Sequence, residues 1–411
     1  MTALALLRKH PRYLLFGFLH FFCSSVGQTY FVGLFVAGVT ASHGWGDDTF
    51  AALYSGATLL AAFSLPVVGV QLDRRSVRTV STITVLVICL GLVVLASTSN
   101  MLIFAVALYA ARLGGQGILP LIGSTTIGRF FQEGRGKALA LTNIGKSVAE
   151  VIVPPAVVAM MAIYGYAAVW YGAATLLLLL FLPAIWLLIR KGDLFQKAER
   201  VAAAQAEDST SAQPASLSRG EAFRDPRLLL ILPAYMLAPF VLTGMVFNQG
   251  LIAEIRTYTI AWMALGLSSY GIARSVFVLL GGPGIDRWGA ERLLLFIHLP
   301  LMLGLLLFLV IDHRMAVPVF FLLCGTGMGA ESVMWPALWS ERYGPRNLGS
   351  IKSAIRVVMV LSTAISPILF TWGFGLSLNV TLWSVLGYGV LAISLVWWQY
   401  WRYPRKVAGV V

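Results

Sequence analysis

Long apolar runs separated by short polar turns dominate this chain. A helix needs about 20 apolar residues to cross a bilayer, whereas the strands of a membrane β-barrel have roughly 10 residues and alternate in polarity. Twelve runs have the length of a helix, so the pattern predicts an all-α membrane protein. The predicted spans are 13–38, 49–72, 77–97, 101–127, 137–162, 166–189, 228–251, 257–283, 292–311, 315–339, 349–372 and 376–401.

One long polar stretch divides the runs into two sets of six. Residues 190–227 are rich in Ala, Gln and Ser with mixed charges, which is typical of a linker rather than of a folded domain. We therefore expect an N-terminal six-helix half at 1–189, a cytoplasmic linker at 190–227 and a C-terminal six-helix half at 228–411.

The basic residues predict an orientation. Of the 30 Lys and Arg residues, 24 lie in the two termini and in the turns on the same side, and only Arg256 and Arg314 lie on the opposite side. Because basic residues concentrate on the cytoplasmic face, we expect both termini in the cytoplasm. The net charge of +13 is then a topology signal that also attracts anionic lipid, which argues against a nucleic-acid partner.

Composition narrows the class of protein further. The chain is 58% hydrophobic and only 11% charged, whereas soluble domains carry roughly 25% charged residues. The three cysteines lie inside apolar runs, and the five histidines are scattered without the spacing of metal ligands. We expect no metal, no cofactor and no enzymatic activity, and we expect a monomer in the bilayer.

The two halves repeat each other at a constant offset of 213 residues. The offset aligns charged turns, glycines, a proline and a tryptophan, which indicates two six-helix units in the same orientation. Such parallel repeats are typical of transporters that rock one half against the other. The aligned pairs are Gly69 and Gly282, Asp73 and Asp286, Arg74 and Arg287, Arg129 and Arg342, Gly136 and Gly349, Pro154 and Pro367, and Trp170 and Trp383.

Two turns carry a family resemblance. The strings GVQLDRRSVR at 69–78 and GPGIDRWGAER at 282–292 resemble the loop signature G-x-x-x-D-R-x-G of the major facilitator superfamily, although Ser76 replaces the second glycine of the first copy. The resemblance covers the whole chain and implies twelve helices in two pseudo-symmetric halves. It also implies a gate formed by Gly69, Asp73, Arg74, Arg78, Gly282, Asp286, Arg287 and Gly289.

A helix N-terminus carries about half a positive charge, so an acid in a basic turn can cap a helix of the other half. We expect Asp73 to cap the helix that starts near 347–350, and Asp286 to cap the helix that starts near Gly136. These caps would latch an outward-facing state and break as the halves rock.

Six ionisable residues fall inside predicted spans, where charge is costly and usually functional. Four are basic and two acidic, so an anionic substrate would supply the missing negative charge. Arginine suits this role because its planar fork binds carboxylates through two hydrogen bonds. The six are Arg112, Lys146, Glu150, Arg274, Glu331 and Arg356.

The arginines suggest a branch of the superfamily. Arg274 and Arg356, in spans 8 and 11, are similar to the basic residues of the monocarboxylate and oxalate–formate carriers, and Arg112 resembles a span 4 motif of the superfamily. Gln28 and Tyr30, in the polar middle of span 1, are further candidates for substrate binding. An interhelical ion pair is the alternative role for each arginine.

Three residues are candidates for proton coupling, namely Glu331, Glu150 and Lys146. Lys146 and Glu150 are four residues apart on one helix, so a local ion pair is an equally good interpretation.

The leading functional hypothesis is a secondary transporter of small organic anions, mono- or dicarboxylates, in a bacterial inner (plasma) membrane. It would work by alternating access, with proton symport or anion exchange. The alternative is a proton-coupled exporter of drugs or metabolites, although 144–158 lacks the glycine pattern of drug antiporters. A non-transporting receptor is a third hypothesis, which has only the linker in its favour.

Overall fold

A computed structural model describes residues 3–69, 75–131, 135–189, 219–343 and 348–403, and these are almost entirely helical. Eleven helical stretches are long and apolar enough to cross a membrane. One of them, Gly136–Leu188, has 53 residues and would be about 80 Å long, more than twice the thickness of a bilayer core. It bends back at Gly165, where φ is 78° and ψ is 166°. This stretch is two spans, which confirms the predicted twelve-helix fold.

The N-terminal half begins with the short helix α1 (Ala3–Lys9). Span 1 consists of α2 (Pro11–Cys23), the 3-10 turn η1 (Ser24–Gly27), α3 (Thr29–Val32), the 3-10 turn η2 (Gly33–Phe35) and α4 (Val36–His43). Spans 2 and 3 are α5 (Asp47–Gly69) and α7 (Val77–Ser97). Span 4 is α8 (Met101–Ala111), the π-helix η3 (Arg112–Ile118) and α9 (Leu119–Phe130), and spans 5 and 6 are α10 (Arg135–Leu176), η4 (Leu177–Phe181) and α11 (Leu182–Leu188).

The predicted linker contains one described helix, α13 (Arg219–Arg224), and the C-terminal half begins after it. Residues 190–218 of that linker are outside the described residues. Span 7 is α14 (Pro226–Phe247) with α15 (Gln249–Ile255), and span 8 is α16 (Ile260–Trp288). Span 9 is α17 (Ala290–Leu294) with α18 (Leu299–Val310). Spans 10, 11 and 12 are α19 (Ala316–Tyr343), α20 (Leu348–Leu376) and α21 (Leu378–Arg402).

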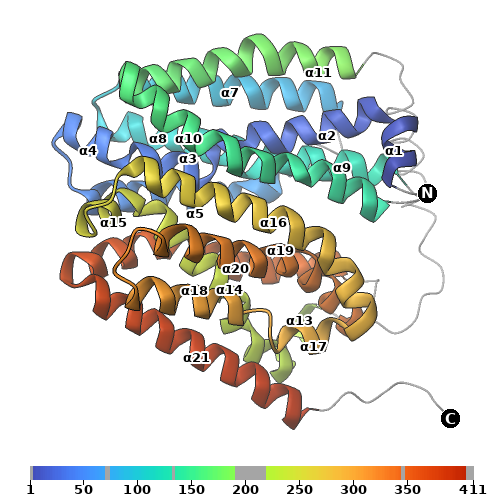
Figure 1. Cartoon of the computed structure of the whole chain (residues 1–411). Helices are drawn as coiled ribbons and strands as arrows, with labels where there is room; N and C mark the ends of the chain where they lie inside the picture. Colours follow the sequence, from blue (N-terminus) through green and yellow to red (C-terminus); the bar gives the residue numbers. More distant parts are fainter. Residues whose placement is uncertain (1–2, 70–74, 132–134, 190–218, 344–347, 404–411) are drawn as a thin grey trace.

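The two halves lie side by side, and each half has its own helices on the outer edge of the molecule (Figure 1). α7 and α11 lie along one outer edge and α21 and α18 along the other, whereas α10, α16, α5 and α20 lie between them. Spans 3, 6, 9 and 12 are therefore peripheral, and their sequences lack deep Lys, Arg, Asp and Glu residues. The start of α1 and the end of α21 lie on one side of the molecule, which we call the termini side.

The halves close against each other on the opposite side, which we call the far side. Tyr54 in α5 packs on Phe247 at the end of α14, with ring centroids 4.6 Å apart. A Cβ atom on Gly33 would lie only 2.8 Å from the carbonyl oxygen of Val246, so the first half touches backbone of the second there. The hydrogen bonds that Ser268 and Arg274 make to the first half lie near mid-helix. The halves are thus in contact on the far side and at the centre.

Candidate functional site

The centre of the molecule is a contact between span 5 of the first half and span 8 of the second. Gly271 lets these helices approach, because a Cβ atom there would lie 2.9 Å from the carbonyl oxygen of Ser147 and 2.8 Å from a methyl group of Val151. One turn earlier, the hydroxyl of Ser268 donates to the carbonyl of Val151 at 2.7 Å. Small residues on one face of α16 therefore set the spacing between the halves.

One turn further along α16, an ion pair joins the halves. Nη1 of Arg274 lies 3.0 Å from Oε2 of Glu150 and donates to the hydroxyl of Ser147 at 3.1 Å. The side chains are 8% and 3% exposed, so the pair is buried and hydrogen-bonded, as a charge in a membrane interior must be. Arg274 thus has the interhelical partner that the sequence left as an alternative. The structure gives Glu150 a partner on α16 rather than the local pairing with Lys146.

Two further cations stand beside this pair. Lys146, one turn before Glu150, is half-buried and lies within electrostatic range of Arg274, Glu150 and Arg356. Arg356, on α20 of the other half, is exposed, and its proximity to Lys146 places it against the space between the halves. Neither side chain hydrogen-bonds to, or forms an ion pair with, another described residue. The described charged groups within electrostatic range of Lys146 are therefore two cations and one carboxylate.

Span 1 is broken beside the same cluster. Gln28 has extended backbone, with φ −79° and ψ 154°, between η1 and α3. Its side chain is 7% exposed and donates to the hydroxyl of Ser24 at 3.5 Å. Tyr30 is also buried, and its phenol lies within electrostatic range of Glu150 and Arg274. Discontinuous helices with free backbone groups commonly form substrate sites in transporters.

Arg112 lies elsewhere, inside the first half. Nη1 donates to the carbonyl of Gly27 at 2.6 Å, Nε donates to the hydroxyl of Thr58 at 3.1 Å, and the guanidinium stacks over the ring of Tyr54 at 4.3 Å. The arginine is 1% exposed. Its donors therefore tie the break in span 1 to spans 2 and 4. The guanidinium of Arg112 is thus surrounded by a carbonyl, a hydroxyl and an aromatic ring, rather than paired with a carboxylate as Arg274 is.

Glu331 meets a residue that the sequence pattern did not single out. Oε1 of Glu331 in α19 lies 3.0 Å from Nδ1 of His298, at the start of α18, and both side chains are buried. The indole nitrogen of Trp335 donates to Oε2 of Glu331 at 3.4 Å. A glutamate and a histidine 33 residues apart give no local sequence signal. The only hint was that the histidine falls inside an apolar run.

The gate motif is only partly visible. Asp73 and Arg74 lie outside the described residues, as does the side chain of Asp286, so both expected caps stay predictions. Gly69 ends α5, and Arg78 stacks on Trp186 at 4.3 Å. The second copy differs from the expected turn in that Gly282, Asp286 and Arg287 belong to α16, because the helix continues to Trp288. Arg287 lies 5.5 Å from the ring of Trp288, and the chain leaves the helix at Gly289, where φ is 76°.

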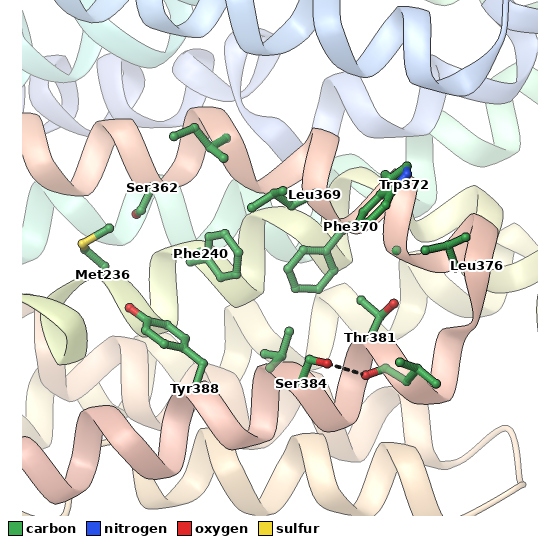
Figure 2. Close-up of a pocket in the computed structure, with 14 residues that line it drawn as sticks. Met236, Phe240, Ser362, Leu369, Phe370, Trp372, Leu376, Thr381, Ser384 and Tyr388 are labelled. Atoms are coloured by element: carbon green, nitrogen blue, oxygen red, sulfur yellow. Dashed lines mark hydrogen bonds between the residues drawn. The ribbon is translucent and has the colours of Figure 1, made fainter.

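A separate apolar groove lies between α14, α20 and α21 (Figure 2). It has a volume of about 660 Å³, and Phe240, Phe370 and Trp372 supply much of its surface. Hydroxyl groups contribute to its polar lining, and the hydroxyl of Ser384 donates a hydrogen bond to the carbonyl of Val380 at 2.8 Å. Trp372 is 67% exposed. The residues that line this groove include none of the charged residues found at the interface between the halves.

The bundle and its central charges define a membrane carrier: two six-helix halves meet at a buried polar site at mid-helix. Residues 17–367 match the major facilitator superfamily, and the chain belongs to that family.

Solved transporters share the fold. The nucleoside transporter NupG superimposes with a TM-score of 0.70 at 12% identity, covering 95% of this chain and 98% of that one. A bacterial homologue of the human lysosomal transporter Spinster, in an inward-facing and unoccupied conformation, superimposes with a TM-score of 0.72 at 12% identity, covering 95% and 97%. A curated relative, the multidrug resistance protein B homologue of Mycobacterium tuberculosis, is 28% identical over 116 residues, which are 28% of this chain and 21% of the relative.

Proposed function

We propose that this carrier moves small organic anions, mono- or dicarboxylates, across a bacterial inner membrane by alternating access, with its termini in the cytoplasm. One observation carries the proposal. At the interface between the halves, the described charged groups within electrostatic range of Lys146 are two arginines, Arg274 and Arg356, and one carboxylate, Glu150, which Arg274 already engages.

The unmatched positive charge supports an anionic substrate. Two neighbouring cations in a medium of low dielectric constant repel each other strongly, and a carboxylate between Lys146 and Arg356 removes that repulsion. Lys146 belongs to the first half and Arg356 to the second, so one bound anion joins both halves. The position of Tyr30 beside the cluster, two residues after the break at Gln28, favours further hydrogen bonds to the substrate from these two residues.

Alternating access follows from the placement of this site. Contacts on the far side and at the centre hold the halves together in this conformation, which favours access to the site from the termini side. An anion that neutralises charges on both halves favours their closer approach, and closure on the termini side then requires the far side to open.

Export of drugs is the second candidate, and the multidrug resistance protein B homologue is the observation in its favour. The charge of the site favours anion transport over drug export, because an excess of cationic side chains repels the cationic compounds that many drug exporters handle. Export of ethidium from inverted vesicles without anion exchange would support the second candidate.

Counterflow in proteoliposomes tests the anion proposal. Vesicles loaded with unlabelled lactate, oxalate or succinate should accumulate the labelled form of at least one of them. Lys146→Gln and Arg356→Gln should each reduce this exchange about tenfold or more, the loss expected for one charge-assisted hydrogen bond. Arg402→Gln, at the exposed end of α21, is the matched control and should exchange like the wild type. Equal exchange in all four proteins, or no exchange of any anion, would contradict the proposal.

A further inference from the structure

His298 and Glu331 face each other inside the second half. Their closest atoms, Nδ1 and Oε1, are 3.0 Å apart, and the side chains are 1% and 6% exposed. Span 9 brings them together because it leaves the helical path between α17 and α18, just before Pro300. Gly327 allows span 10 to approach, since a Cβ atom there would lie 3.2 Å from the carbonyl oxygen of Ile297.

The pair is incompletely hydrogen-bonded for so buried a position. Neither ring nitrogen of His298 nor Oε1 of Glu331 has a hydrogen bond of good geometry from a described residue. Only Oε2 of Glu331 accepts one, from Trp335. Such groups are costly unless they serve a function. Other titratable groups that the described residues place around Glu331 are Tyr235 on α14, Tyr270 on α16 and Cys324 on α19. Arg356 lies near Tyr235, and Arg274 and Glu150 lie near Tyr270.

We propose that His298 and Glu331 together form a proton-binding site that is coupled to the anion site, which makes this protein a proton–anion symporter. This inference rests on the proposed function for the anion and adds the coupling ion, the residues that hold it and the direction of coupling.

Charge counting gives the coupling. With one proton the pair has no net charge, whether as imidazolium and carboxylate or as imidazole and carboxylic acid. A second proton makes it positive and loss of the first makes it negative, so nearby charges influence how many protons the pair holds. Without substrate, the positive charge of Arg356, which lies near Tyr235 as Glu331 does, favours the negative form. A bound anion cancels that field and favours proton uptake.

Tyr235 connects the two sites in space. Its phenol is within electrostatic range of both Arg356 and Glu331, and its ring meets Trp335 edge-on at a centroid distance of 4.9 Å. Trp335 stacks on Trp339, which stacks on Tyr343, at 5.3 and 6.3 Å. This aromatic row runs from Glu331 toward the end of α19 and keeps the surroundings of the pair apolar. Because coupling is reciprocal, a proton on the pair must tighten anion binding by the same factor as an anion tightens proton binding.

Infrared difference spectroscopy on the purified full-length protein tests the proton site without any substrate. A pH titration should show the carbonyl stretch of a buried carboxylic acid, and Glu331→Gln should remove that band. His298→Asn should move the titration midpoint of the band, which a purely structural histidine would not do. Glu254→Gln, at an exposed position on α15, should leave the band unchanged. A wild-type band that Glu331→Gln retains would overturn the proton site.

Transport then tests the coupling. Counterflow of lactate, oxalate or succinate needs no net proton movement, whereas accumulation driven by a pH gradient does. Glu331→Gln should retain counterflow within about twofold and lose gradient-driven accumulation by about tenfold or more, a loss within the usual range of coupling factors. Retained counterflow also shows that the variant is folded. Counterflow with unchanged gradient-driven accumulation would overturn this inference alone, whereas absence of wild-type counterflow would overturn the proposed function.

Discussion

The two halves share a backbone plan but differ in what they place at equivalent positions. At the offset of 213 residues, Arg112 corresponds to Gly325. Arg112 reaches across to spans 1 and 2, whereas Gly325 lets span 10 touch span 8, because a Cβ atom there would lie 2.4 Å from the carbonyl oxygen of Tyr270. In the first half, this position connects helices through the hydrogen bonds of a long arginine side chain. In the second half, a glycine at the same position lets two helices come into close contact.

The termini-side rim shows the same divergence. Glu291 and Gln399 are joined through Arg342, which binds Glu291 with two hydrogen bonds of 2.6 and 2.7 Å and donates to Gln399 at 3.0 Å. The equivalents of Glu291 and Gln399 are Arg78 and Trp186, which contact each other directly through a cation–π interaction. The repeat thus preserves which helices are tied together while the chemistry of the tie changes.

The buried functional charges follow no repeat at all. The equivalents of His298 and Glu331 are Val85 and Ile118, two buried core residues. The proposed proton pair therefore belongs to the second half alone. The repeat relates the backbones of the two halves, whereas the buried charged side chains differ between them.

The largest expected effect comes from filling the close contact at Gly325. Gly325→Val would force a side chain against the backbone of Tyr270, and backbone cannot yield as a flexible side chain does. We expect destabilisation of more than about 3 kcal/mol, the upper part of the range for overpacking, with little monodisperse protein after purification. Gly375→Ala is the control, because nothing lies within 4 Å of its Cβ position. Normal yield and melting temperature for Gly325→Val would show that spans 8 and 10 are farther apart.

Much of this architecture was predictable from sequence, and the reason is physical. Apolar length alone specifies a membrane span, so the twelve helices and their division into halves followed from hydropathy. The polar middle of span 1 was predicted as a source of hydrogen-bond donors, whereas the break at Gln28 was not predicted.

The partners of the buried charges were not predictable in this way. Glu150 had a lysine one turn away, yet its carboxylate points to Arg274 across the interface. His298 and Glu331 meet because of a turn in span 9 and a glycine in span 10, and both depend on how the helices rotate against each other. A hydropathy profile does not depend on how each helix is rotated about its axis. The pairing of side chains between spans therefore has to come from the three-dimensional structure.

A smaller effect is expected at Arg112. Arg112→Gln would remove the hydrogen bonds to Gly27 and Thr58 and leave a buried carbonyl without its donor. We expect a loss of about 3 kcal/mol, the contribution of one or two hydrogen bonds from a charged group, seen as a lower thermal midpoint in detergent. Arg356→Gln provides the contrast. That side chain is exposed and makes no ion pair with a described residue, so the midpoint should stay near the wild-type value while anion exchange falls. The reverse pattern would place the substrate at Arg112.

The smallest effects are expected at the second glycine position of the gate motif, which is Ser76 in the first copy and Gly289 in the second. Each of these two residues is replaced by the residue of the other copy. Gly289 has φ 76° and ψ 152°, a conformation that is strained for any other residue, so Gly289→Ser should cost about 1–2 kcal/mol. Its equivalent, Ser76, has φ −63° and ψ 140°, and its hydroxyl accepts from the backbone N–H of Thr79 at 3.2 Å as the N-cap of α7. Ser76→Gly should therefore cost only a few tenths of a kcal/mol, because glycine is itself a tolerable N-cap. Thermal midpoints of the two variants, measured side by side in the same detergent, check the difference. Equal losses would mean that the two turns share one backbone conformation, and that the serine of the first copy is a neutral replacement rather than a helix cap.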